Sequence, residues 1–187
     1  ISLGLSFTAM GEERITDVSL IFSYDQSPEG GKEVGELTAV SSSSQFTVEG
    51  SGYLKDDDTW SYGEWPVGEV ELSANEGYYF PTAARSLFHL SGDGVQYQSA
   101  RTEDEGSTLI LHVRLPRIDG AIPAPLTADW SGHTAVWDEV DGADQYEIQL
   151  LKDRRTLTTL TSSAASCSFE NWINNEGSYT FRVRAYN

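Results

Sequence analysis

The sequence predicts an all-β protein made of two tandem antiparallel β-sandwiches joined by a short proline-rich linker. β-branched and aromatic residues alternate with polar residues at a period of two along most of the chain. Turn-forming runs separate these segments at intervals of about 8–12 residues, as in sandwich folds. Three of the six prolines fall within residues 116–125, where the alternation stops. These three observations predict strands, sandwiches and a domain boundary, respectively.

The first part of the chain, residues 15–117, is predicted to form one sandwich. Its turns are expected at residues 27–31, 91–94 and 103–106, which are rich in Gly, Ser, Asp and Glu. Near its end, Leu109, Leu111 and Val113 alternate with more polar positions, as in a strand with one wetter face. The strands are expected at residues 15–24, 36–40, 45–54, 67–74, 77–80, 86–90, 95–101 and 107–115.

A semi-rigid linker is predicted at residues 118–125, because proline fixes the backbone angle φ. A second sandwich follows at residues 126–187. Its strands are expected at residues 134–137, 144–151, 156–161, 165–169 and 178–186. The alternation within the last of these places Tyr179, Phe181, Val183 and Ala185 on one inward face.

Two segments of the second part resemble a fibronectin type III domain. Residues 135–148 (AVWDEVDGADQYEI) resemble the second and third strands of that family, and residues 177–185 (GSYTFRVRA) resemble its penultimate strand. The resemblance implies a core that contains Trp137, Tyr146, Tyr179 and Phe181, with Trp172 in a helical turn at residues 171–173 plugging one end. The family has a seventh strand after this point, so we expect a domain truncated before further modules; the alternative is a last strand from the N-terminal region.

The first part carries a second resemblance. Residues 71–80 (ELSANEGYYF) resemble a segment of immunoglobulin-like modules in surface proteins of Gram-positive bacteria. This implies an Ig-like sandwich followed by a fibronectin type III-like one, in a secreted or cell-surface protein associated with the cell wall. Residues 1–14 lack an initiator Met and a basic leader region, so we expect them to follow a removed leader.

Charge and motif content argue against several functions. The formal net charge is −17, which opposes binding to nucleic acid or to an anionic membrane. No stretch approaches the ~20 apolar residues of a membrane-spanning helix. Cys167 is the only cysteine, and the sequence contains no nucleophile elbow, zinc-protease motif or phosphate-binding loop. The sequence therefore predicts a protein that is not an enzyme and has no cofactor.

The best candidate for a binding site is an aromatic and acidic loop. Exposed Trp and Tyr beside carboxylates can stack on sugar rings or anchor a protein interface. Three consecutive acids in the loop could supply oxygens to Ca²⁺, although their register differs from that of an EF-hand and we favour a solvated loop tip. The aromatic residues are Tyr53, Trp60, Tyr62 and Trp65, and the acids are Asp56, Asp57 and Asp58.

The predicted function is a non-catalytic, monomeric interaction or spacer module outside the cell, with a protein or a cell-wall glycan as partner. The alternative is a carbohydrate-binding module that uses the loop from Tyr53 to Trp65. Two buried tryptophans at positions 60 and 65 would favour the spacer, and two exposed ones would favour sugar binding.

Overall fold

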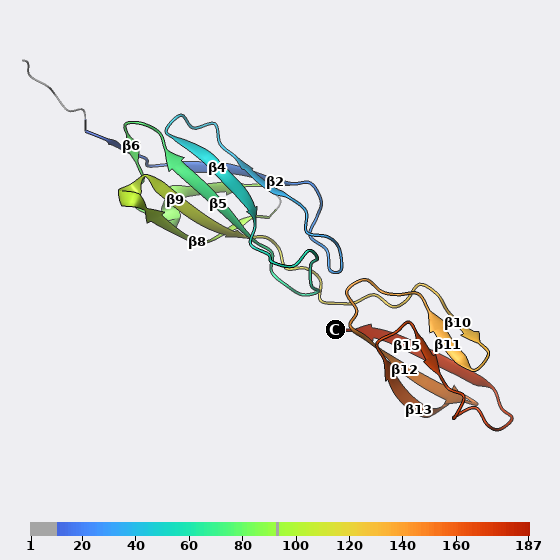
Figure 1. Ribbon diagram of the computed structural model, residues 1–187. Helices are drawn as coiled ribbons and strands as arrows, with labels where there is room; N and C mark the ends of the chain where they lie inside the picture. The colour runs from blue at the N-terminus through green and yellow to red at the C-terminus, as the bar shows by residue number, and fades with distance from the viewer. Residues whose placement is uncertain (1–10, 93) are drawn as a thin grey trace, which may run out of the picture. The chain divides into compact units, whose positions relative to one another are not determined.

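The computed structural model describes residues 11–92 and 94–187, and these residues form an all-β protein (Figure 1). Their strands make five open sheets, with two short 3-10 helices, Arg85–Leu87 and Asp104–Gly106. The chain divides into two compact units. Unit 1 holds residues up to Ser27, Val34–Asp56 and Trp65–Arg117, and unit 2 holds Pro28–Glu33, Asp57–Glu64 and Ile118–Asn187. Most of the segment expected after a leader, residues 1–10, lies outside the described residues.

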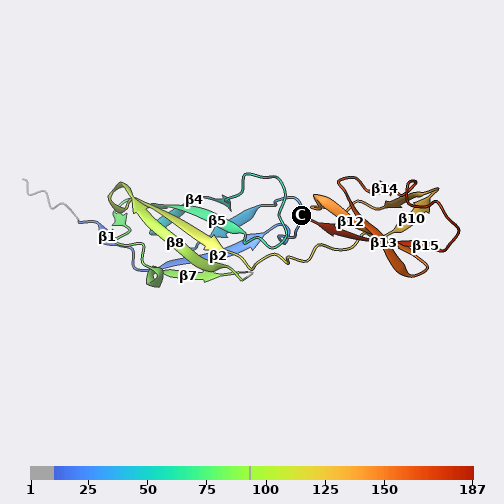
Figure 2. The same ribbon diagram turned by 90° about the horizontal axis from the view of Figure 1, so that it is seen from below.

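Unit 1 contains a three-stranded and a four-stranded sheet (Figure 2). The first has the order β3-β2-β7, and the second has the order β4-β5-β9-β8 with antiparallel pairing throughout. The strands are β2 (Val18–Tyr24), β3 (Leu37–Val40), β4 (Phe46–Tyr53), β5 (Val67–Ala74), β7 (Phe88–Ser91), β8 (Gln96–Glu103) and β9 (Thr108–Arg114).

Two strand pairs of unit 1 are parallel, which corrects the expectation of purely antiparallel sheets. β2 pairs in parallel with β7, and β1 (Glu13–Arg14) pairs in parallel with β6 (Tyr78–Tyr79). Parallel neighbours need a long crossover connection. Here the chain from β2 to β7 passes through the four-stranded sheet before it returns, so local alternation could not reveal the direction of pairing.

One apolar core is shared by the two larger sheets of unit 1. The alternating residues Val18, Leu20 and Phe22 of β2 contribute from one sheet, and Val70 and Leu72 of β5 contribute from the other. Leu109, Leu111 and Val113 of β9 are also buried, while Arg114 is exposed. The period-two pattern therefore places the core side of these strands correctly.

Unit 2 contains two three-stranded sheets around a smaller core. Trp137, Tyr146, Ile148, Leu150 and Phe169 are buried there. β10 (Ala128–Ser131), β11 (Thr134–Trp137) and β14 (Ser166–Ser168) form one sheet, and β13 (Arg155–Ser162), β12 (Gln145–Lys152) and β15 (Tyr179–Tyr186) form the other.

The remaining residues expected in the core of unit 2 lie nearer the surface. Tyr179 and Phe181 of β15 are half-buried and pack against the core from its side. Trp172 is 40% exposed, so the expectation that it plugs the core is wrong. Residues 171–173 do not form a helix; Trp172 lies in a turn in which its backbone N–H donates to the carbonyl oxygen of Phe169 over 2.8 Å.

Candidate functional site

The aromatic residues predicted to form one binding loop lie in different surroundings. Trp60 belongs to unit 2 and is only 3% exposed, whereas Trp65 belongs to unit 1 and is 49% exposed. Tyr53 is half-buried in unit 1 and packs against its core. One tryptophan is thus buried and one exposed, so neither pattern expected for a spacer or for a sugar platform is met.

The acidic run does not gather a metal site. Asp56, Asp57 and Asp58 are all exposed. Among the described residues, no group of three or more His, Cys, Asp or Glu side chains is placed to hold a metal ion. The oxygens that Ca²⁺ would require are therefore not brought together in this part of the chain.

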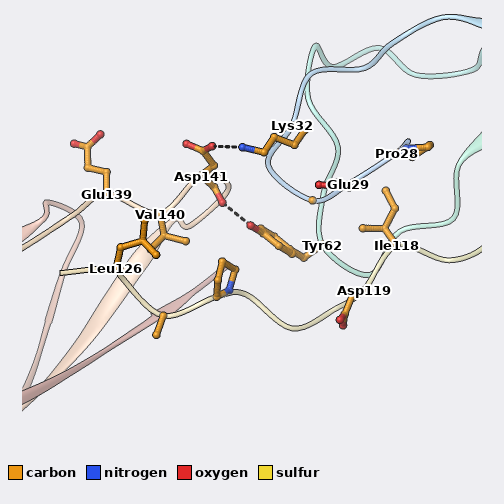
Figure 3. Close-up of a pocket in the computed structure, with 13 residues that line it drawn as sticks. Pro28, Glu29, Lys32, Tyr62, Ile118, Asp119, Leu126, Glu139, Val140 and Asp141 are labelled. Atoms are coloured by element: carbon orange, nitrogen blue, oxygen red, sulfur yellow. Dashed lines mark hydrogen bonds and ion pairs between the residues drawn. The ribbon is translucent and has the colours of Figure 1, made fainter. Parts of the chain in front are cut away.

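Within unit 2, the fourth aromatic residue, Tyr62, is held against the turn at Asp141 (Figure 3). The Tyr62 hydroxyl donates a 2.9 Å hydrogen bond to the backbone carbonyl oxygen of Asp141, and the Lys32 Nζ lies 3.1 Å from Oδ2 of the Asp141 side chain. Burial raises the pKa of Tyr62, the charge of Asp141 raises it further and Lys32 opposes this. Hydrogen bonding to Asp141, and then the charge of Asp141, raise the pKa of Lys32.

Backbone contacts hold the segments that carry Lys32 and Tyr62. The Trp60 N–H donates to the Lys32 carbonyl over 2.8 Å, and the Gly31 N–H donates to the Trp60 carbonyl over 2.8 Å. Gly142 has a φ of +77°, and a Cβ there would lie 2.7 Å from Cε2 of Tyr62. Position 142 therefore favours glycine for two reasons: its positive φ and the close approach of the Tyr62 ring.

Lys32, Tyr62 and Asp141 line a hollow of about 510 Å³ in unit 2 (Figure 3). Its apolar lining includes Ile118, Pro123, Val140 and Leu126, and the Leu126 residue is 94% exposed. The lining also includes the carboxylates of Glu29, Asp119 and Glu139. The hollow is thus an apolar surface with acidic groups around it, within the volume range of ligand pockets.

The solvent-facing side of the four-stranded sheet in unit 1 carries a polar cluster. Glu69 and His112 are register partners on β5 and β9, and Oε2 of Glu69 lies 2.8 Å from Nε2 of His112. Ser99 of β8 faces His112 from the other side, with 3.4 Å between its Oγ and Nδ1 of the imidazole. On the same strand as His112, the Arg114 guanidinium lies 4.5 Å from the centre of the Trp65 ring. The arrangement can bind polar groups, and Arg114 makes a cation–π contact with the Trp65 ring, which stays 49% exposed.

Sequence reasoning did not find Lys32, Asp141 or the cluster of Glu69, Ser99 and His112. The members of each group lie far apart in the chain and meet only through strand register or loop packing. A signal existed for the sheet cluster alone, because alternation already placed His112 on the wetter face of β9.

Comparisons with protein-family models, curated proteins and solved structures found no match to this chain. Within the described residues, no helix has the length and apolar character needed to span a membrane.

Proposed function

We propose that this chain is a non-catalytic interaction and spacer module of a secreted or surface-exposed bacterial protein, possessing an Ig-like sandwich and then a fibronectin type III-like one. The finer fold assignment is supported by the positions of the two resembling segments. Residues 135–148 and 177–185 fall on β11, β12 and β15, which contribute to the core of unit 2. A protein or a cell-wall glycan is the expected partner.

The observation that carries the interaction role is the exposure of Leu126 in the hollow of unit 2. Leu126 is 94% exposed to water, and a bound partner would remove its apolar side chain from water. Ile118 and Val140 extend the apolar surface beside it. A partner that places an apolar side chain here would bury all of them, which is how anchor residues stabilise protein interfaces.

The charged side chains of the hollow favour a partner that combines apolar and basic character. Glu29, Asp119 and Glu139 line it, and the positive charge of Lys32 is already paired with Asp141. A Lys or Arg flanking the apolar anchor would meet these carboxylates. The hollow therefore suits a polypeptide segment with an apolar residue next to a basic one.

Selection from a random peptide library tests this proposal. We expect enriched peptides to combine apolar and basic residues and to bind the unchanged chain, with at least about a tenfold loss of affinity, ~1.4 kcal/mol, for Leu126→Asp. Ile21→Asp is the matched control, because Ile21 is an exposed apolar residue outside the hollow. Equal binding to both variants, or no enrichment at all, would overturn the assignment of the hollow.

The non-catalytic part of the proposal has its own test at the cluster on β5, β8 and β9. The order of contacts Ser99, His112, Glu69 is that of a hydrolytic triad. The Ser99 Oγ, however, lies 3.4 Å from the imidazole, and the three side chains stand on the solvent-facing side of a sheet. We expect hydrolysis of p-nitrophenyl acetate to proceed equally with the unchanged chain and Ser99→Ala. A rate that falls with Ser99→Ala would contradict a non-catalytic role.

Carbohydrate binding through Trp65 is the second candidate function. It is favoured by the exposure of the Trp65 ring beside Arg114. It is weakened by the burial of Trp60, which removes one of the two predicted stacking rings. Saccharide-dependent protection of Trp65 from acrylamide quenching, lost in Trp65→Ala, would support this candidate over a purely protein-binding module.

A further inference from the structure

A second hollow in unit 2 lies where the turn after β14 meets β12 and β15. It has a volume of about 280 Å³, and its lining includes Trp172, Tyr179 and three asparagines, Asn171, Asn174 and Asn175. Lys152 of β12, Leu157 of β13 and Tyr179 of β15 line it, and these three strands form one sheet. It shares no lining residue with the hollow of Figure 3.

From this lining we infer that unit 2 binds a neutral saccharide in the hollow of Trp172. Each asparagine amide offers both donors and acceptors, which matches the dual donor and acceptor character of a sugar hydroxyl. The Trp172 ring offers an apolar face that can stack on the C–H face of a pyranose. The volume of about 280 Å³ lies just below the usual range for ligand pockets, about 300–1,000 Å³, and suits a small ligand of one or two sugar rings.

The asparagines keep hydrogen-bonding capacity for a ligand. Nδ2 of Asn175 donates to Oδ1 of Asn174 over 2.9 Å, which leaves the Asn174 amide donors available. The Asn171 side chain makes no hydrogen bond to any described residue, and all three asparagines are exposed. The asparagine amides face water in the free protein. On binding, they would replace hydrogen bonds to water with hydrogen bonds to the ligand.

The turn that carries these residues is fixed at both ends before any ligand binds. At its start, the backbone N–H groups of Trp172 and Ile173 donate to the carbonyl of buried Phe169 over 2.8 and 3.0 Å. At its end, the Tyr179 hydroxyl donates to the Asn175 carbonyl over 2.9 Å. A pre-ordered turn lowers the entropy cost of binding, which matters for a small polar ligand.

Charge favours an uncharged ligand over a basic peptide. The chain has 29 acidic residues, yet none of them lines this hollow within the described residues. The one charged lining residue, Lys152, has its Nζ 5.6 Å from the centre of the Tyr179 ring. The hollow of Leu126, with its carboxylates, differs in this respect, so the two sites are suited to different partners.

Fluorine NMR of the chain labelled with 5-fluorotryptophan tests the inference, because the sequence has five tryptophans that report separately. Single Trp→Phe substitutions assign the signals. Glucose, galactose, mannose and N-acetylglucosamine, as monosaccharides and as tetrasaccharides, serve as probes. We expect at least one to shift the Trp172 signal saturably, with a dissociation constant on the order of 1 mM or lower.

Two substitutions define the expected site. Asn174→Asp replaces the donor side of the amide with a carboxylate of similar shape and should weaken binding by at least about tenfold. Trp172→Ala should abolish the binding measured by calorimetry, and its exposed position allows the domain to fold. Trp65→Phe is the matched control from unit 1, and it should change affinity by less than about twofold.

Three results would overturn the inference. The Trp172 signal could stay unmoved by every saccharide, or only the Trp65 signal could move, which would place sugar binding in unit 1. Peptides selected on the hollow of Leu126 could move the Trp172 signal while no saccharide does, which would make this hollow a protein contact. Leu126→Asp should leave the saccharide titration unchanged, so the inference and the proposed peptide site can fail separately.

Discussion

Trp137 and Tyr146 pack edge to face in the core of unit 2, with ring centroids 5.3 Å apart and an interplanar angle of 60°. The Tyr146 hydroxyl also accepts a 2.9 Å hydrogen bond from the backbone N–H of Val140. One side chain therefore fills the core and caps the polar backbone of the turn between β11 and β12. Because this polar contact is partly buried, breaking it costs more than it contributes when formed.

Tyr146→Phe should lower the free energy of unfolding by about 1–3 kcal/mol, because the Val140 N–H loses its acceptor while the ring packing is kept. Urea unfolding followed by circular dichroism measures the change. Tyr24→Phe is the control, since the half-buried Tyr24 makes no side-chain hydrogen bond to a described residue. Equal unfolding midpoints for the two variants would contradict this role of the Tyr146 hydroxyl.

The Tyr62 phenol should ionise at a higher pH than a tyrosine in water does. Its pKa is raised above 10.0 by burial and by Asp141, so the folded state holds the phenol proton more tightly than the unfolded state does. The resulting stabilisation is present below about pH 10 and is lost as the pH rises through the folded pKa. The difference between the ultraviolet pH titrations of the unchanged chain and Tyr62→Phe should show one phenol with a midpoint above 10. A midpoint at or below 10 would refute it.

Gly92→Ala should destabilise unit 1 by about 1–3 kcal/mol. Gly92 has a φ of +105°, and a Cβ there would collide with the carbonyl oxygen of Phe22. Gly52→Ala is the matched variant, because a Cβ at Gly52 meets nothing within 4 Å and alanine suits a strand better than glycine does. Thermal unfolding should separate the two, with Gly52→Ala as stable as the unchanged chain or more so. An equal loss of stability in the two variants would contradict the role given to the positive φ of Gly92 and to its close approach to Phe22.

Cys167 should react slowly with thiol reagents in the folded chain. Burial raises the pKa of its thiol, and the thiolate is the reactive form. At pH 8, 5,5′-dithiobis(2-nitrobenzoate) should modify the folded chain more slowly than the chain in urea, and the folded rate should increase as the pH approaches the raised pKa. Because the folded pKa is raised, ionisation of Cys167 destabilises the fold at alkaline pH. Equal rates in both states would contradict this.

Strand positions were the most predictable part of the fold. Val67–Ala74 and Thr134–Trp137 were predicted to the residue, because their alternation is bounded by clear turn residues. β10 was missed, since Ala128–Ser131 is short and contains an Asp within an otherwise weak pattern. Sheet pairing was not predictable, because alternation fixes which side chains face inward but not which strands are neighbours.

The candidate sites were less predictable for the same reason. Trp60 and Trp65 lie five residues apart in the same loop region of the sequence, yet one is buried and the other exposed. Trp172 was assigned to the core from the resemblance to a fibronectin type III domain, whereas the buried Phe169 three residues earlier occupies the core instead. Burial of a loop aromatic depends on which strands the loop joins, which local sequence does not encode.

The parallel pairing of β2 with β7 has a consequence for how the chain is made. β2 leaves the ribosome before its parallel partner β7, which starts at Phe88 and follows about 4–14 s later at translation rates of ~5–20 residues per second. During that interval the apolar row of Val18, Leu20 and Phe22 has β3 as a possible neighbour, but the opposing sheet still lacks β8 and β9. The nascent chain therefore exposes an incomplete β-surface for seconds, which makes its synthesis a stage at which a chaperone can hold it unfolded.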